Sequence, residues 1–172
     1  NNFSDEDNWL FDAVPGTGSD VRFNLDEVYQ VDFDMDADSR SIDVSAGDVT
    51  FDLGGHLYEI EDDVDEDGFI SYLRVQRPVS QGILDASLTL TSSSGSGELR
   101  LQEGWDIDIA NADETIGAVT VDGDMRLAIG GNDGKLRIGT AGQGTLRLTD
   151  GAQVEVPTAD VGDDQGSFGL VE

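Results

Sequence analysis

An acidic loop near the middle of the chain has the spacing of a metal site. Asp63, Asp65 and Asp67 alternate with other residues and are followed by a glycine and Phe69. Three alternating carboxylates can converge on one cation, the glycine permits the sharp turn, and the Phe69 carbonyl can add a ligand. The spacing therefore predicts a calcium site at Asp63, Asp65, Asp67 and Phe69. An acidic surface turn is the alternative.

The loop does not extend into an EF-hand. That motif needs Glu at its twelfth position, where this chain has Arg74, and the flanks alternate as strands do. Glu61 or Asp62 could supply the missing ligand. Residues 130–134 (Gly-Gly-Asn-Asp-Gly) resemble one arm of a calcium-binding nonapeptide, but the arm occurs once, which favours a plain glycine turn.

The remaining candidates for catalysis are few. His56 is the only histidine and follows two glycines, so we expect a turn histidine and no multi-histidine metal site. No G-x-S-x-G elbow accompanies it, which argues against a serine triad. With 37 acidic residues, some carboxylate pair will always have the spacing of a glycosidase, so that pairing indicates nothing. We expect no enzymatic activity.

The segments that would position these residues read as β-strands. Apolar and polar residues alternate with a period of two, most clearly over residues 29–35, and the gaps carry Gly, Asp, Asn and Ser. Further strands are expected at residues 42–44, 49–53, 88–90, 99–101, 105–109, 119–121, 127–129, 136–138, 146–148 and 154–156. The fold class is therefore all-β, with Trp9 and Trp105 in apolar contexts that favour the core.

Internal similarity favours a solenoid over a sandwich or barrel. Residues 95–104 match residues 142–151 at six of ten positions, and residues 115–120 correspond to 167–172. The offsets of 47 and 52 residues suggest a unit of about 50 residues that occurs twice. In such a fold the strands from Leu88 onward are mainly parallel, and the following residues point inward: Leu99, Leu101, Val119, Val121, Leu136, Ile138, Leu146 and Leu148.

The charge of the chain limits its partners. The 37 acidic residues outnumber the 9 basic ones, giving a formal net charge of -28. Such a polyanion repels nucleic acid and anionic lipid, attracts cations, and needs salt or divalent ions to offset its self-repulsion. Cysteine is absent, and no apolar run is long enough to span a membrane. We expect neither nucleic-acid binding nor a membrane span.

Two stretches resemble a known kind of exported protein. The second half is similar to the Gly-rich repeat of autotransporter passengers and PEP-CTERM proteins, through Gly142, Gly144, Leu146, Leu148, Gly151, Val154, Ser167, Gly169 and Val171. The first half resembles the entry segment of large exported proteins of planctomycetes and related bacteria. The matching residues there are 3–5, 8–9, 14–16, Asp20, 23–24, 29–31 and 47–54.

The resemblance implies a right-handed parallel β-helix on an exported surface or matrix protein, and it implies no catalytic residue. We expect three parts: an N-terminal, less regular β entry or cap segment (residues 1–60), an acidic loop with connecting strands (61–86) and β-helix repeats (87–172). The repeats are expected to break off in mid-coil at Glu172.

The expected function is a structural, extracellular or cell-surface β-solenoid module of a layer, stalk, fibre or matrix. It would depend on cations and self-associate head to tail, or belong to a longer repeat chain, with Phe168, Leu170 and Val171 forming an adhesive end. The alternatives are an adhesin or carbohydrate-binding arm and a polysaccharide-degrading enzyme. An exposed aromatic strip would favour the first alternative, and a deep groove with carboxylates facing arginines the second.

Overall fold

The computed structural model describes residues 1–61, 72–78, 86–102 and 104–172. Within them lie a short 3₁₀ turn, η1 (Glu6–Asn8), and eighteen strands. The strands are β1 (Asp20–Phe23), β2 (Val28–Asp32), β3 (Ala37–Ser39), β4 (Ser41–Val44), β5 (Asp48–Asp52), β6 (Leu57–Ile60), β7 (Tyr72–Val75), β8 (Arg77–Pro78), β9 (Ala86–Thr91), β10 (Gly97–Leu101), β11 (Asp106–Ile109), β12 (Thr115–Asp122), β13 (Met125–Ile129), β14 (Lys135–Ile138), β15 (Gln143–Thr149), β16 (Gln153–Glu155), β17 (Thr158–Val161) and β18 (Phe168–Val171).

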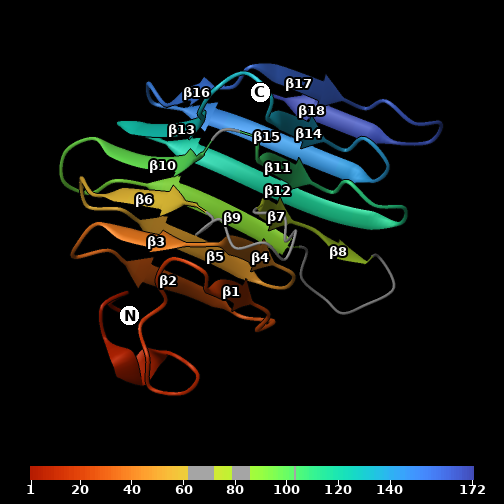
Figure 1. Cartoon of the computed structure of the whole chain (residues 1–172). Coiled ribbons are helices and arrows are strands. Elements are labelled where there is room, and N and C mark those ends of the chain that lie inside the picture. Colours follow the sequence, from red (N-terminus) through yellow and green to blue (C-terminus); the bar gives the residue numbers. More distant parts are fainter. Residues whose placement is uncertain (62–71, 79–85, 103) are drawn as a thin grey trace.

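Three sheets form the sides of the molecule, and the chain visits them in a fixed order, turn after turn (Figure 1). The β1 sheet has the order β1-β4-β7-β11-β14-β17, the β2 sheet has β2-β5-β9-β12-β15-β18, and the β3 sheet has β3-β6-β10-β13-β16. All pairs along these orders are parallel; β8 alone, among the described strands, pairs antiparallel, with β12. The fold is all-β and solenoid-like, and the prediction of parallel strands from Leu88 onward is confirmed.

The period-two alternation of the sequence places alternate side chains in the core and on the outer surface. Strand β12 alternates buried and half-buried residues along its whole length, because successive side chains point to opposite faces. Of the eight residues predicted to point inward, seven are buried and Leu148 packs against the core as a partly buried residue. The core is one continuous cluster that runs from Phe3 to Leu146.

The predicted unit of about 50 residues is wrong in part. Strands β10 and β15, which carry the two best-matching segments, lie in different sheets and therefore do not repeat one another. The alternating leucines recur because a strand with one face on this core needs an apolar residue at every second position. Strands β12 and β18 do share a sheet, two places apart, so the second correspondence spans two turns of the chain.

The strand predicted over residues 29–35 ends early, at Asp32. Phe33 still donates its backbone N–H to Asp52 O, but the chain then turns, and Asp36 accepts the backbone N–H of Leu57 at 3.0 Å. Met35 is exposed at this turn. Alternation alone cannot show where a strand ends and a turn begins, because Asp34 and Asp36 suit both the outer face of a strand and a turn.

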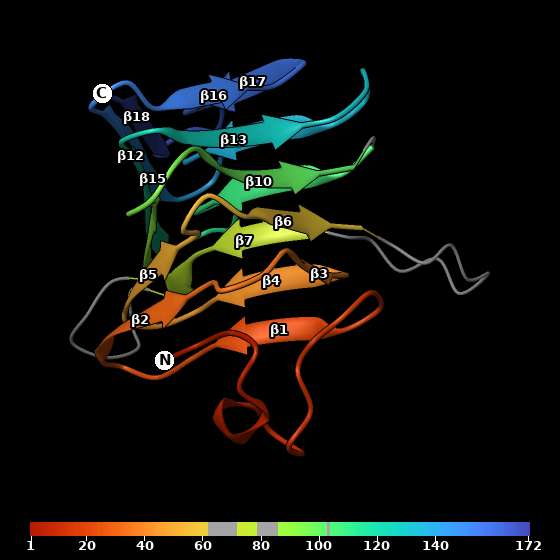
Figure 2. The same ribbon diagram turned by 90° about the vertical axis from the view of Figure 1, so that its left-hand side faces the viewer.

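The first residues lie outside the three sheets. Residues 1–19 form a looped segment with η1 that lies at the β1/β2 end of the molecule (Figure 2). Phe3 anchors it, stacking on Phe33 and meeting Tyr58 edge-on. From Asp20 on, the strands of the predicted entry segment (1–60) belong to the same sheets as those of the predicted repeats (87–172).

Candidate functional site

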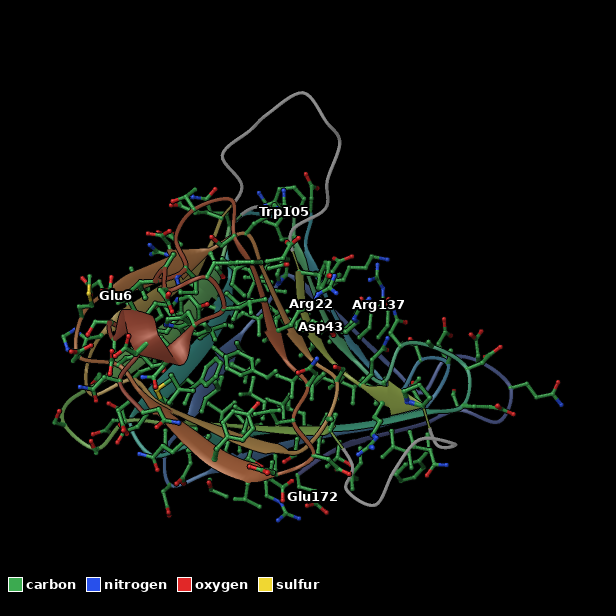
Figure 3. The ribbon with its side chains drawn as sticks, turned by 90° about the horizontal axis from the view of Figure 1, so that it is seen from below. Glu6, Arg22, Asp43, Trp105, Arg137 and Glu172 are labelled. Carbon is green, nitrogen blue, oxygen red and sulfur yellow. The ribbon has the colours of Figure 1, made fainter. Side chains whose placement is uncertain are left out.

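A row of alternating charges crosses the outer face of the β1 sheet. One residue from each of its six strands occupies the same column of the register, and the sign of the charge changes at every step. We call this column the charge ladder; in order along the sheet its members are Arg22, Asp43, Arg74, Asp108, Arg137 and Asp160. Figure 3 shows Arg22, Asp43 and Arg137 along one side of the molecule, viewed from the N-terminal end.

Two steps of the ladder, Asp43–Arg74 and Asp108–Arg137, are close ion pairs. Arg74 binds Asp43 through two nitrogens, with both N···O distances at 3.0 Å. Its guanidinium also lies 4.8 Å from the centre of the Tyr72 ring. Arg137 reaches Asp106 at 2.7 Å and Asp108 at 3.1 Å. Such pairs hold neighbouring strands in register, because a one-residue slip would place each charge on the wrong face.

Ion pairs shift the pKa of Arg74 in the ladder and of Asp20 beside it. The hydrogen bond to Asp43, helped by the charge of that carboxylate, raises the pKa of Arg74 although burial opposes this. Next to the ladder, the hydrogen bond from Arg40 lowers the pKa of Asp20, against the opposing effect of burial. A carboxylate whose pKa is lowered by an arginine is a poor proton donor, so Asp20 is unsuited to act as the general acid of glycoside hydrolysis.

The β3 sheet carries a second set of pairs on its outer face. Arg126 bridges Glu98 on β10, at 2.6 Å, and Glu155 on β16. One strand pair further on, Arg100 binds Glu59 at 2.9 Å. The hydrogen bond to Glu155 is the main cause of the raised pKa of Arg126. These arginines are thus spaced so that each ties its own strand to at least one neighbour.

The outer face of the β2 sheet is different, because hydroxyl groups replace most of the charges. Thr50, Thr89 and Thr120 occupy one column on three neighbouring strands. This side is polar, and the described residues place no aromatic strip on it of the kind that would favour a carbohydrate-binding arm.

A hollow of about 1000 Å³ opens at the N-terminal end of the molecule, between the entry residues 1–19 and the first turn of the solenoid. Its floor consists of inward-facing residues of β1 and β2: Val21, Phe23, Tyr29 and Val31. Burial, and secondarily the charge of Glu27, raises the pKa of Tyr29 to about 12, so its phenol stays neutral at ordinary pH.

The rim of this hollow exposes several large apolar side chains. Leu10 and Phe11 of the entry segment are 81% and 86% exposed, and Leu25 and Val28 are 58% and 73% exposed. Leu10, Phe11 and Leu25 line the hollow, whereas Val28 belongs to β2 and lies on its outer face at the same end of the molecule. A gathering of apolar residues on one surface marks an interaction site more often than scattered ones do.

The predicted calcium ligands Asp63, Asp65, Asp67 and Phe69 lie outside the described residues. Within the described part of the chain, no three His, Asp or Glu side chains are grouped so that they could hold a metal ion. None of the helical turns described there has the length and apolar character needed to cross a bilayer.

The remaining candidates from the sequence, His56 and the two tryptophans, contact residues that hold the fold together. His56 follows the turn at Gly55, with Nδ1 3.4 Å from an Asp36 carboxylate oxygen, as expected of a turn histidine. Both tryptophans are partly buried against the core, as predicted. Trp9 donates its indole N–H to Phe3 O at 2.7 Å, which ties the entry segment to the core.

Sequence reasoning missed both the charge ladder and the hollow. The ladder has a local signal, since most of its charges stand between two apolar residues of a strand, as Arg74 does between Leu73 and Val75. Its alternation appears only once the strands are stacked in order. The hollow has no such signal, because it depends on where the entry segment folds.

Comparison of the chain with protein-family models, with curated proteins and with solved structures finds no match.

Proposed function

We propose that this chain is a structural module of an extracellular or cell-surface assembly, a segment of right-handed parallel β-helix that joins with others into an extended object. The observation that carries the proposal is the contrast between its polar, ion-paired sides and its apolar ends. The handedness follows from a general rule, since crossovers between parallel strands of one sheet are right-handed in about 98% of cases.

A structural role fits the chemistry of the sides. Asp43 and Asp108 of the charge ladder bond to arginines on neighbouring strands, and Asp160 pairs with Lys135 at 3.7 Å. Such an arrangement strengthens a sheet and leaves little for catalysis. The outer hydroxyl column of the β2 sheet offers a plain polar face. These features support a scaffold in preference to a polysaccharide-degrading enzyme.

Cation dependence is part of the proposal. A net charge of -28 opposes both compaction and association, and salt or divalent cations offset it. General screening of the charge does not require calcium, because any cation can supply it. A specific need for calcium would arise only if the loop at Asp63, Asp65 and Asp67 binds it. Removing divalent ions at low salt should therefore lower the melting temperature, and Asp63→Asn/Asp65→Asn should weaken that response only if the loop is a site.

The experiment that tests the function is light scattering of the 172-residue chain over a range of protein concentration, in low salt, in high salt and with added calcium. We expect particles larger than a monomer that grow with concentration once the charge is screened. A monodisperse monomer under all of these conditions would contradict the proposal.

A further inference from the structure

The two ends of the solenoid match one another in the β1 and β2 sheets. At one end the outer strands are β1 and β2; at the other they are β17 and β18. We propose that the hollow at the β1/β2 end receives the β17/β18 end of a second copy, so that two sheets continue in parallel register from one molecule into the next. This inference rests on the proposed function and specifies the contact between copies. We call the contact of β17 and β18 of one copy with β1 and β2 of the next the joint.

The charge ladder supports the joint because its two ends carry opposite charges. The ladder begins with Arg22 on β1 and ends with Asp160 on β17. If β17 of one copy pairs with β1 of the next in the same register, Asp160 faces Arg22 and the alternation continues without a break. A ladder that began and ended with the same sign would instead place like charges together.

The apolar columns of the same register also continue. In the β1 sheet the column that starts at Phe23 ends at Val161, which is 44% exposed. In the β2 sheet the column that starts at Tyr29 ends at Val171, which is 48% exposed. The joint would therefore place Val161 beside Phe23 and Val171 beside Tyr29 in the continued columns. Phe23 is only 6% exposed and its ring centroid lies 6.3 Å from that of Trp9, so Val161 would pack along this aromatic pair.

An outer column repeats this match. Val28 begins the β2-sheet column that ends at Leu170, so the two apolar side chains would meet on the outside of the joint. An apolar residue as large as Val28 is unusual at this outward position. Between Val28 and Leu170 the same column holds only small or polar residues: Asp48, Ser87, Ala118 and Thr145. A second copy gives both end residues an apolar neighbour.

The third sheet leaves room for the entry segment. The β3 sheet has five strands, one fewer than the main path of the other two, so a joint made by β1 and β2 leaves one strand position open there. Residues 1–3 bond along the end of β2 at Asp32, and Figure 3 shows Glu6 of η1 on the side away from Arg22. Part of the entry segment lies on that side, where the Thr17 hydroxyl donates to Asp38 at 2.8 Å. This part would separate Glu155 of one copy from Asp38 of the next, whose shared column would otherwise oppose two acids.

The experiment exchanges charges at the joint. Arg22→Asp alone would bring two carboxylates together there, and Asp160→Arg alone would bring two guanidinium groups together. Each variant alone should therefore associate at least roughly tenfold more weakly than the parent chain. An equimolar mixture of the two variants should regain association, because the joint that pairs their two exchanged residues again brings opposite charges together. Sedimentation velocity will measure the association at about 0.15 M salt. The Debye length is then about 8 Å, so two charges in direct contact still interact.

A second pair of variants covers the case in which a charge exchange prevents folding, which circular dichroism will report. Val28→Asp places a charge in the joint. Met35→Asp changes another exposed apolar residue, at the corner where Ser4 of the entry segment bonds to Asp34. We expect Val28→Asp to reduce association roughly tenfold or more and Met35→Asp to leave it unchanged.

The outcomes separate this joint from the broader function. If the parent chain associates but neither the charge exchanges nor Val28→Asp weakens association, the joint is wrong and self-association stands. If the two single variants weaken association and their mixture does not restore it, the pairing of Arg22 with Asp160 is wrong. If the parent chain stays monomeric, both the joint and the proposed function are wrong.

Discussion

The sides and the ends of this molecule differ in the side chains that they present to solvent. On the sides, arginines are placed one strand away from carboxylates, as Arg74 is from Asp43 and Arg126 from Glu98. At the ends, large apolar side chains such as Val28 and Phe168 face solvent, 73% and 55% exposed. On the proposed function, the sides would resist contact with other polyanionic copies, whereas the ends would favour it.

The largest expected difference separates the core from the ends. Phe51 is fully buried and contacts Phe23, Phe33 and Tyr58 with ring-centroid distances of 5.1, 5.3 and 6.1 Å. Phe51→Ala should lower the free energy of unfolding by about 3–5 kcal/mol, since it removes a large side chain and leaves a cavity. Urea unfolding will measure this loss.

The matched variant is Leu25→Ala, at an exposed apolar residue of the N-terminal end. Its effect on the unfolding of the monomer should stay within about 0.5 kcal/mol, because little buried surface is removed. If Leu25→Ala cost as much as Phe51→Ala, the end would be part of the core and the contrast would fail.

A smaller effect is expected on the sides. Asp43→Ala leaves the half-buried guanidinium of Arg74 without its two-pronged partner, and should lower the free energy of unfolding by about 1–3 kcal/mol. The control is Asp163→Ala, at an exposed carboxylate with no ion pair to a described residue, which should be neutral within about 0.5 kcal/mol. Equal effects at Asp43 and Asp163 would mean that the charge ladder does not stabilise the sheet.

The smallest effect concerns pH. The hydrogen bond from Arg40 lowers the pKa of Asp20, so the contribution of Asp20 to stability is fully present above its unfolded pKa of about 4 and is lost as the pH falls through the lower folded value. The stability difference between the parent chain and Asp20→Asn should be constant from about pH 7 to pH 5 and shrink below about pH 4. A difference that stays constant down to about pH 2 would show that Asp20 has an ordinary pKa.

Sequence alone was enough for many of the strands and their inner faces, because one-sided burial produces a period of two around residues such as Leu136 and Ile138. It was also enough to predict parallel stacking. It did not predict β1, β3, β6 or β17. It was not enough for the length of a turn, since β10 and β15 share a pattern but lie in different sheets. Registers between strands are set by corners and loops, which the pattern within a strand does not encode.

The candidate site was harder to predict than the fold. Arg22 and Asp160 are far apart in the sequence, and their relation at opposite ends of one ladder needs the whole stack of strands. The hollow needs the entry segment to fold beneath Phe23 and Tyr29, and the anchor of that segment, Phe3, has no periodic signal around it. The acidic loop was the easiest to recognise, and it lies outside the described residues.

Small-angle X-ray scattering of the 172-residue chain, over a series of protein concentrations in screening salt, tests most directly whether ends join while sides repel. We expect the cross-sectional radius of gyration to stay at the value of a single molecule while the length of the particle increases, because each added copy extends the same sheets. Particles that thicken as they grow, or a particle of constant length at every concentration, would contradict the account.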